Sequence, residues 1–229
     1  MAVRVGVVQF PGTNCELDVA FVIAQLGCEA EILFHAERSL RGVDAVVVPG
    51  GFAHGDYLRT GAIARFSPVM DAVAELAAAG GPVVGICNGF QVLCEAGLLP
   101  GALQKNAGLK FLCETVALRV ETADSALTRD ADVGQVLRIP INHFEGSYVC
   151  DAPTLARLAA EDRVVVRYLE NPNGSLDDIA GICNEGRNVV GLMPHPERAS
   201  DPLLGSVEGL VMLRSLLAAA RDRNAVRVP

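Results

Sequence analysis

The sequence predicts an α/β fold: a mostly parallel central sheet flanked by helices, with added antiparallel strands in the second half. Three observations carry this prediction. In the first hundred residues, short apolar segments alternate with helical ones, as in parallel sheets. These segments are apolar throughout, which is typical of strands buried on both faces. Beyond residue 114, strands follow one another with fewer helices between them, which favours antiparallel pairing.

The first half of the chain reads β-α-β-β-α-β-α. A strand is expected over residues 3–10. Asn14 is the expected cap of a helix over residues 15–26, and Gly27 marks the end of that helix. The remaining elements expected here are strands at 29–34, 45–49 and 82–86, a helix over about 61–79, and a helix after residue 87.

The second half is expected to be richer in strands. Glu185-Gly186-Arg187 is short enough to join two strands as a hairpin. A final helix over about residues 204–220 carries Leu210, Leu213 and Leu217 on one face and should cover the sheet. The strands are expected at 114–121, 135–140, 147–150, 164–168, 179–184 and 188–193.

Composition limits the class of protein. With 229 residues, of which 51% are hydrophobic, the chain can bury a substantial core, and we expect a single domain over residues 1–229. A net charge of -8 and the lack of a basic run argue against nucleic acid as a partner. Seven scattered cysteines and a strand that begins near Val3 predict a reduced, cytoplasmic protein. No apolar run approaches the ~18 residues of a membrane span, so no membrane partner is expected.

Cys87 is the predicted nucleophile. It ends the apolar segment 83–86 and precedes an amphipathic segment, so it is expected at an elbow between a strand and a helix. Gly85 and Gly89 flank it, as such a turn requires, because the backbone packs closely there. The helix would direct unpaired N–H groups and its positive end toward the sulfur. By contrast, Cys28, Cys94, Cys113, Cys150 and Cys183 are expected to be structural.

His195 and Glu197 are the predicted partners of Cys87. They follow the apolar segment 189–193, and alternation along an extended chain would place both side chains on one side. A cysteine nucleophile needs a base to accept its proton and a third group to orient that base. Cys87, His195 and Glu197 therefore form a candidate catalytic triad. No Cys-x-x-Cys or His-Glu-x-x-His pattern occurs, so no metal site is expected.

Gly50 and Gly51 follow a third apolar segment and suggest an oxyanion hole. Glycine lets a backbone N–H face a ligand without a side chain in the way. A tetrahedral intermediate of acyl transfer needs such donors for its negative oxygen. We therefore predict that the N–H groups of Gly51 and Asn88 form the oxyanion hole.

With these segments placed, the chain resembles the class I (triad) glutamine amidotransferases over its whole length. The motifs that carry the resemblance are the pair Gly50-Gly51, the elbow from Gly85 to Gln91, and the late His195-Pro196-Glu197. The resemblance implies hydrolysis of the side-chain amide of glutamine through a γ-glutamyl thioester on Cys87. The ammonia released would pass to a partner enzyme.

One branch of this family is the closer resemblance. Residues 10–16, 50–64, 87–91 and 193–199 resemble the glutaminases that serve the fourth step of de novo purine biosynthesis. The resemblance implies that this free chain works with a separate large synthetase subunit and a small accessory subunit. ATP and Mg are implied for the synthetase, and no cofactor is implied for this chain.

The resemblance also suggests residues that contact glutamine. Gln91 lies at the start of the elbow helix, where it would contact glutamine or brace the turn. His143 lies in a loop expected to contact the α-amino and carboxylate groups of glutamine, and its alternative role is to stabilise that loop. Phe144 departs from the glycine-containing turn of many relatives.

The loop after the oxyanion glycines is predicted to face the partner. His54, Asp56, Tyr57 and Arg59 are too polar and varied to form a core. We assign them to the rim of the pocket, where the synthetase would dock and set the Gly51 peptide for catalysis. The alternative is a solvated loop without a partner.

Three alternatives remain at this point. Chaperone- and protease-like proteins of related fold also place a cysteine at an elbow, but their base histidine usually follows it directly, where this chain has Asn88. A non-catalytic regulatory domain would be expected to lack a triad member. A glutaminase for pyridoxal phosphate or histidine formation would keep the chemistry and change the partner, and the segments around Asn14 and Asp56 weigh against it.

Overall fold

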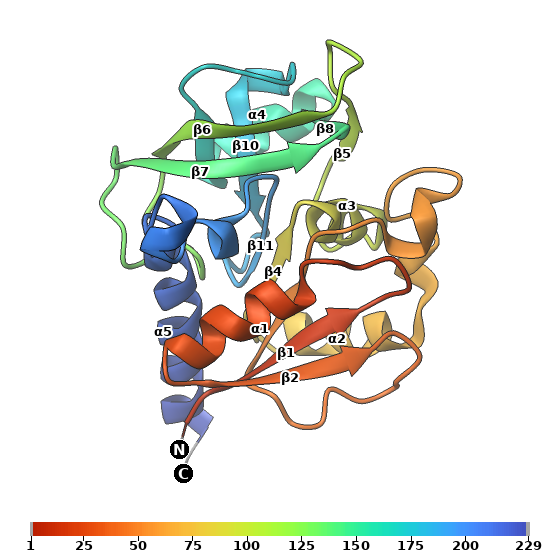
Figure 1. Cartoon of the computed structure of the whole chain (residues 1–229), viewed down its shortest axis with the longest axis vertical. Helices are drawn as coiled ribbons and strands as arrows, with labels where there is room; N and C mark the ends of the chain where they lie inside the picture. Colours follow the sequence, from red (N-terminus) through yellow and green to blue (C-terminus); the bar gives the residue numbers. More distant parts are fainter. Residues whose placement is uncertain (1, 228–229) are drawn as a thin grey trace.

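A computed structural model of the chain describes residues 2–227 and shows a large mixed sheet flanked by helices (Figure 1). Residues 1, 228 and 229 of the domain expected over 1–229 lie outside the described part. Within that part, nine strands form one sheet in the order β2-β1-β3-β4-β11-β10-β9-β6-β7, and β5 and β8 form a second, small sheet. The α/β class and the added antiparallel strands are thus confirmed.

The parallel half of the sheet comes mainly from the first part of the chain. Strands β1 to β4 and β11 run parallel to one another, and their side chains are mostly buried. Helix α1 crosses in front of β1 and β2 in Figure 1, and α2 lies behind them. The elements are β1 (Arg4–Gln9), α1 (Glu16–Gln25), β2 (Glu29–Phe34), β3 (Ala45–Val48), α2 (Pro68–Ala78), β4 (Val83–Ile86), α3 (Asn88–Glu95) and β11 (Val189–Leu192).

The antiparallel half continues the sheet from β11. Each of the pairs β11–β10, β10–β9, β9–β6 and β6–β7 is antiparallel, and residues 185–187 make the expected hairpin between β10 and β11. The elements are β5 (Ala102–Lys105), β6 (Leu112–Val120), β7 (Val136–His143), β8 (Glu145–Val149), α4 (Ala152–Ala160), β9 (Val164–Tyr168), β10 (Ile179–Cys183) and α5 (Leu210–Arg227).

Several element boundaries differ from the expected ones. The expected cap Asn14 is wrong: Cys15 holds the N-cap position of α1 and makes no side-chain cap bond. Helix α2 begins at Pro68 and not near residue 61, because Ser67, which precedes a proline, is held extended. Helix α5 begins at Leu210 and not at residue 204, because Gly205 ends a preceding 3-10 turn in the left-handed region. Strand β5 and helix α4 were not predicted.

Helix α3 packs unusually close to strand β3. A Cβ placed on Gly89, the second residue of α3, would lie 1.8 Å from the carbonyl oxygen of Val48 and 2.6 Å from its carbonyl carbon. A backbone carbonyl cannot rotate away as a side chain can. Gly89 therefore sets how closely the start of α3 approaches the sheet.

We expect Gly89→Ala to destabilise the fold. Overpacking of this kind costs about 1–3 kcal/mol, which corresponds to a fall in Tm of about 2–12 °C for a chain of this size. Thermal unfolding followed by circular dichroism measures the effect. Gly108→Ala is the matched control, because a Cβ there would meet nothing within 4 Å. Equal Tm values for the two variants would contradict the proposed close contact.

Candidate active site

The predicted site residues meet at one edge of the sheet. Cys87 directly follows β4, Gly50 and Gly51 follow β3 closely, and His195 follows β11. Because these three strands are parallel neighbours, their carboxyl ends lie together. Ligands of α/β proteins bind at this edge. The topology thus brings together residues that are more than a hundred positions apart in sequence.

Cys87 has a strained backbone. Its φ of 52° and ψ of -108° lie in a region that non-glycine residues rarely adopt. Such outliers persist where the surrounding structure imposes them, and they are frequent at active sites. Here the Cys87 N–H bonds to the Leu192 carbonyl of β11, and the Cys87 carbonyl accepts bonds from the N–H groups of Phe90 and Gln91. The elbow predicted for Cys87 is present, and the side chain borders a small cavity.

His195 and Glu197 are in direct contact. Nδ1 of His195 lies 2.7 Å from Oε1 of Glu197, and both side chains are buried. The expected reason for this contact was wrong: β11 ends at Leu192, and Pro196–Arg198 form a 3-10 turn with His195 at its start. The turn, and not extended alternation, brings the two side chains together. The N–H of His195 donates to the Pro140 carbonyl, which anchors the turn to β7.

The surroundings of His195 favour its charged form. Burial lowers the pKa of the imidazole, but the carboxylate of Glu197 and the sulfurs of Cys87 and Cys15 raise it by more, so the pKa lies well above its usual value. Nε2 of His195 has no hydrogen-bond partner among the described residues. In cysteine and serine hydrolases this nitrogen faces the nucleophile.

Gly50 marks the point where these groups converge. A Cβ placed on Gly50 would lie 2.7 Å from Cε1 of His195, 3.5 Å from Cβ of Cys87 and 3.2 Å from Sγ of Cys15. The imidazole therefore lies beside Cys87. Contacts between a base and its nucleophile are often loose before substrate binds.

Cys15 is a site neighbour that the sequence did not reveal. Nη2 of Arg198 lies 3.1 Å from its sulfur, and the side chain is buried. Donor atoms of Cys15, His195 and Glu197 lie within 4.8 Å of one another, so these residues could approach a soft metal ion. The bond between His195 and Glu197 and the cationic Arg198 compete with such a ligand set. The absence of a metal stays a prediction.

Gly51 and Asn88 lie where the oxyanion hole is predicted. Gly51 borders the same cavity as Cys87. Its φ is 150°, and a Cβ there would lie 2.7 Å from Cα of Thr13, so the position requires glycine. Asn88 is the first residue of α3, and the first N–H groups of a helix have no partner within it. The roles of both N–H groups stay predictions.

Gln91 and His143 both border this cavity, whose volume is about 180 Å³. Oε1 of Gln91 accepts a bond from Asn88, and its Nε2 donates to the carbonyl of Glu145. These bonds favour the bracing role, and direct contact of Gln91 with glutamine stays a prediction. His143 is also buried, and its Nδ1 lies 3.0 Å from Oδ1 of Asn106.

The loop after the oxyanion glycines divides into two parts. Tyr57 is 74% exposed and the Arg59 side chain 64%, as expected of a rim. His54 departs from this expectation: its ring packs against those of Phe10 and His35. Asp56 is half-buried and borders the cavity. Both residues have a left-handed backbone conformation.

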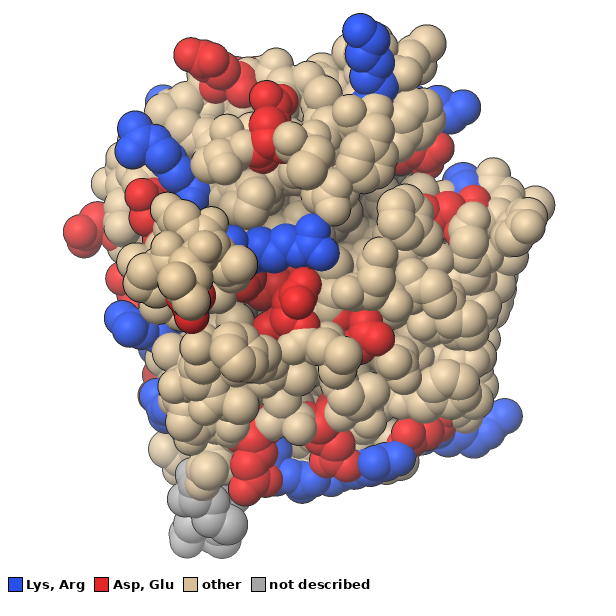
Figure 2. Space-filling view, viewed as in Figure 1, with Lys and Arg blue, Asp and Glu red and all other residues tan. Residues whose placement is uncertain are grey.

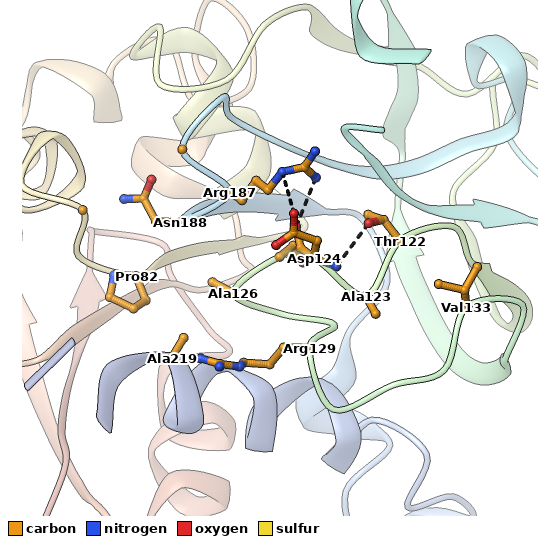
Figure 3. Close-up of a pocket in the computed structure, with 13 residues that line it drawn as sticks. Pro82, Thr122, Ala123, Asp124, Ala126, Arg129, Val133, Arg187, Asn188 and Ala219 are labelled. Atoms are coloured by element: carbon orange, nitrogen blue, oxygen red, sulfur yellow. Dashed lines mark hydrogen bonds and ion pairs between the residues drawn. The ribbon is translucent and has the colours of Figure 1, made fainter. Parts of the chain in front are cut away.

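A cavity larger than the one beside Cys87 lies away from this site. It has a volume of about 720 Å³ and includes Pro82, Asp124 and Arg187 in its wall (Figure 3). Pro82 precedes β4 whereas Cys87 follows it, so the cavity lies at the opposite edge of the sheet. Its two arginines are already paired: Nε of Arg187 lies 3.0 Å from Oδ2 of Asp124, and Nη2 of Arg129 lies 2.6 Å from Oδ2 of Asp222. Volume alone therefore does not identify the active site.

The surface carries mixed charges. Figure 2 shows acidic and basic side chains interspersed on one face, with no continuous basic patch. In residues 2–227, no helix is both long enough and apolar enough to cross a bilayer.

Comparisons with known proteins agree with this geometry. Residues 2–209 match the family model of the CobB/CobQ-like glutamine amidotransferase domain. The chain is 62% identical over 218 residues to the phosphoribosylformylglycinamidine synthase subunit PurQ of Rubrobacter xylanophilus, covering 95% of this chain and 99% of that one. It is 54% identical to the PurQ subunit of Koribacter versatilis, and the match covers 96% of this chain and 100% of that one.

A solved structure shows the same fold. A chain of PurLQS from Thermotoga maritima superposes with a TM-score of 0.88 at 41% identity, covering 95% of this chain and 99% of that one. Sequence and structure thus agree over nearly the whole length. The chain belongs to the family of CobB/CobQ-like glutamine amidotransferase domains.

Proposed function

We propose that the chain is the glutaminase subunit of a phosphoribosylformylglycinamidine synthase. It hydrolyses glutamine to glutamate and ammonia and delivers the ammonia to a separate synthetase in de novo purine biosynthesis. The observation that carries this proposal is the 62% identity to a PurQ subunit over almost the full length of both chains. The geometry supports it, because a cysteine at a strained elbow and a buried histidine–glutamate pair meet at one edge of the sheet.

The site suggests how the reaction proceeds. The sulfur of Cys87 attacks the amide carbon of glutamine, and the N–H groups of Gly51 and Asn88 stabilise the negative oxygen. His195 takes up the thiol proton and gives it to the departing ammonia, while Glu197 holds the Nδ1–H of the imidazole. The raised pKa of His195 favours the imidazolium that protonates the leaving group. Water then hydrolyses the thioester on Cys87 with His195 as base.

The proposed enzyme needs two further subunits. A large synthetase subunit and a small accessory subunit complete the enzyme, and the solved relative comes from the complex PurLQS. ATP and Mg serve the synthetase, and this chain needs no cofactor. We place the protein in the cytoplasm, where a reducing environment keeps thiols such as Cys87 free. All seven cysteines are unpaired here.

Co-purification from the native host tests the partner. The chain should bring down a large ATP-dependent synthetase and a small third chain, identified by mass spectrometry. The assembled complex should form phosphoribosylformylglycinamidine with glutamine as the nitrogen source. Capture of a synthetase from pyridoxal phosphate or histidine formation would overturn the assigned pathway and leave the glutaminase chemistry.

The isolated chain is expected to be a poor glutaminase that its synthetase activates. Coupling between sites commonly amounts to about 5–150-fold, and we expect activation in this range from docking at the loop after Gly51. Arg59→Ala should weaken this activation and leave the fold intact, because Arg59 is exposed and its one ion pair in the described residues is with Glu95. Glutamate release by free and assembled protein measures the effect.

Arg41→Ala is the control for this prediction. Arg41 is also an exposed arginine in ion pairs, but it lies beyond β2 and away from the loop. Arg41→Ala should leave activation by the synthetase unchanged. Equal glutaminase rates for the free and assembled wild type would contradict activation by the partner.

A further inference from the structure

The cavity beside Cys87 is acidic. The charged residues that border it are Asp56 and Glu145, and neither lysine nor arginine is among its lining residues. The two residues come from different parts of the cavity wall: Asp56 belongs to the loop after β3, and Glu145 begins β8. Burial and, to a smaller extent, the nearby Glu145 raise the pKa of Asp56 to about 6, although the hydrogen bond from Asn88 opposes this rise. A cation between the two groups would offset the repulsion between their negative charges.

A chain of amide hydrogen bonds connects these two parts of the wall. Nδ2 of Asn88 donates to Oδ1 of Asp56 at 3.0 Å and to Oε1 of Gln91 at 2.8 Å. Nε2 of Gln91 in turn donates to the backbone carbonyl of Glu145. Oδ1 of Asn88 accepts the N–H of Ala53 at 2.9 Å. Since a backbone N–H can only donate, this bond fixes which way the Asn88 amide points.

The Asn88 side chain therefore links substrate pocket and oxyanion hole. Ala53 lies two residues after Gly51, whose N–H is a predicted oxyanion donor, and the N–H of Asn88 itself is the other. A change at Asp56 can therefore alter the positions of both oxyanion donors through the side chain of Asn88. This network is fully paired, as buried polar groups need to be.

His143 adds an acceptor to the same cavity. Oδ1 of Asn106 accepts the N–H of Gly146 at 3.1 Å and faces Nδ1 of His143 at 3.0 Å, so Nδ1 carries the proton. Burial and the neighbouring His195 lower the pKa of His143 to about 4, which keeps the ring neutral. Nε2 is then a lone-pair acceptor, and it is buried without a partner among the described residues. The cavity thus offers acceptors and negative charge to whatever binds.

We propose that Asp56 and Glu145 bind the α-ammonium group of glutamine, and that Asn88 transmits this contact to the loop that carries Gly51. The inference rests on the proposed function, because it takes glutamine to be the substrate. Glutamine has one cationic group, at the end of the molecule remote from its reacting amide. Recognition of that group would exclude amides that lack it, and it would set the oxyanion donors as the substrate enters.

The test compares glutamine with 4-carbamoylbutanoate, which lacks only the α-amino group. In the assembled complex, Asp56→Asn and Glu145→Gln should each raise KM for glutamine about tenfold, the scale of one charge-assisted hydrogen bond, with kcat changed less than about twofold. For 4-carbamoylbutanoate, kcat/KM should change little. Glu121→Gln is the control, because Glu121 is also a partly buried glutamate, but it pairs with Arg119 and does not border the cavity.

A second variant tests the link to the oxyanion loop. Asp56→Asn keeps a side-chain oxygen that can accept from Asn88, whereas Asp56→Ala removes it. Asp56→Ala should therefore lower kcat as well as raise KM. If it matched Asp56→Asn in kcat, transmission through Asn88 would be refuted.

Other outcomes separate this inference from the proposed function. Equal losses with both substrates, or an unchanged KM for glutamine, would overturn the α-ammonium contact while glutaminase activity stands. Normal glutamate release with ammonia lost to solvent would assign the carboxylates to ammonia transfer and also overturn it. If the wild-type complex released no glutamate, the proposed function would fail, and calorimetric binding of both compounds to Cys87→Ala, with and without Asp56→Asn, would still decide the contact.

Discussion

Cys87→Ala is expected to abolish glutamine-dependent synthesis in the assembled enzyme and to leave ammonium-dependent synthesis intact. Without the sulfur no thioester can form, and loss of a nucleophile lowers turnover by roughly 10⁶-fold. The synthetase site is on another chain, so added ammonium bypasses the defect. Parallel assays with glutamine and with ammonium as nitrogen source measure the two activities.

A control and a labelling experiment sharpen this prediction. Cys28→Ala removes another buried cysteine, which contacts Arg221 and not the site, and should behave as wild type. An electrophilic glutamine analogue should label Cys87. Labelling of Cys15, which lies near the same imidazole, or glutamine-dependent turnover in Cys87→Ala would show that the nucleophile is misassigned.

Glu197→Gln is expected to lower kcat by about 10³–10⁴-fold, as loss of the corresponding carboxylate does in serine proteases. The carboxylate accepts from Nδ1 of His195 at 2.7 Å and holds the tautomer that exposes Nε2. An amide can donate to Nδ1 instead and stabilise the wrong tautomer. KM for glutamine should change much less, because Glu197 does not border the cavity. Steady-state glutaminase kinetics give both constants.

The pH profile distinguishes this role from a structural one. The charge of Glu197 raises the pKa of His195, so its removal lowers that pKa. The limb of the kcat/KM profile that reports His195 should therefore move to lower pH in Glu197→Gln. Glu197→Asp keeps the charge at a shorter reach and should retain more activity and move the limb less. Wild-type kcat in Glu197→Gln would remove this residue from the triad.

The sequence predicted best those features that depend on a few neighbouring residues. Gly85 and Gly89 around Cys87 predicted the elbow, because few residues other than glycine allow such close approach of helix and strand. The parallel pairing of β4 with β11 was not predicted, because the two strands lie about a hundred residues apart in the sequence. Helix α4 was missed although Asp151 caps it by accepting from the N–H of Thr154. That cap was the available signal, and it was overlooked among the surrounding strands.

Other features depend on contacts that no local pattern encodes. Cys15 meets Arg198 only because the start of α1 and the turn after β11 share one edge of the sheet. Asp56 looks like a solvated loop residue in sequence, yet a left-handed backbone turns it toward Asn88. The triad contact itself was predicted from the wrong local geometry, since a 3-10 turn and not an extended strand joins His195 to Glu197.

The position of β4 between β3 and β11 also governs when the site can form during synthesis. Its second neighbour, β11, begins about a hundred residues after β4 ends. At roughly 5–20 residues per second, the ribosome needs about 5–20 s to supply it. Until then, the nascent chain carries Cys87 without the strand that accepts its N–H and without the base. On the proposed mechanism, a chain that ends before β11 lacks His195 and cannot release ammonia from glutamine, so the order of translation would keep unfinished protein inactive.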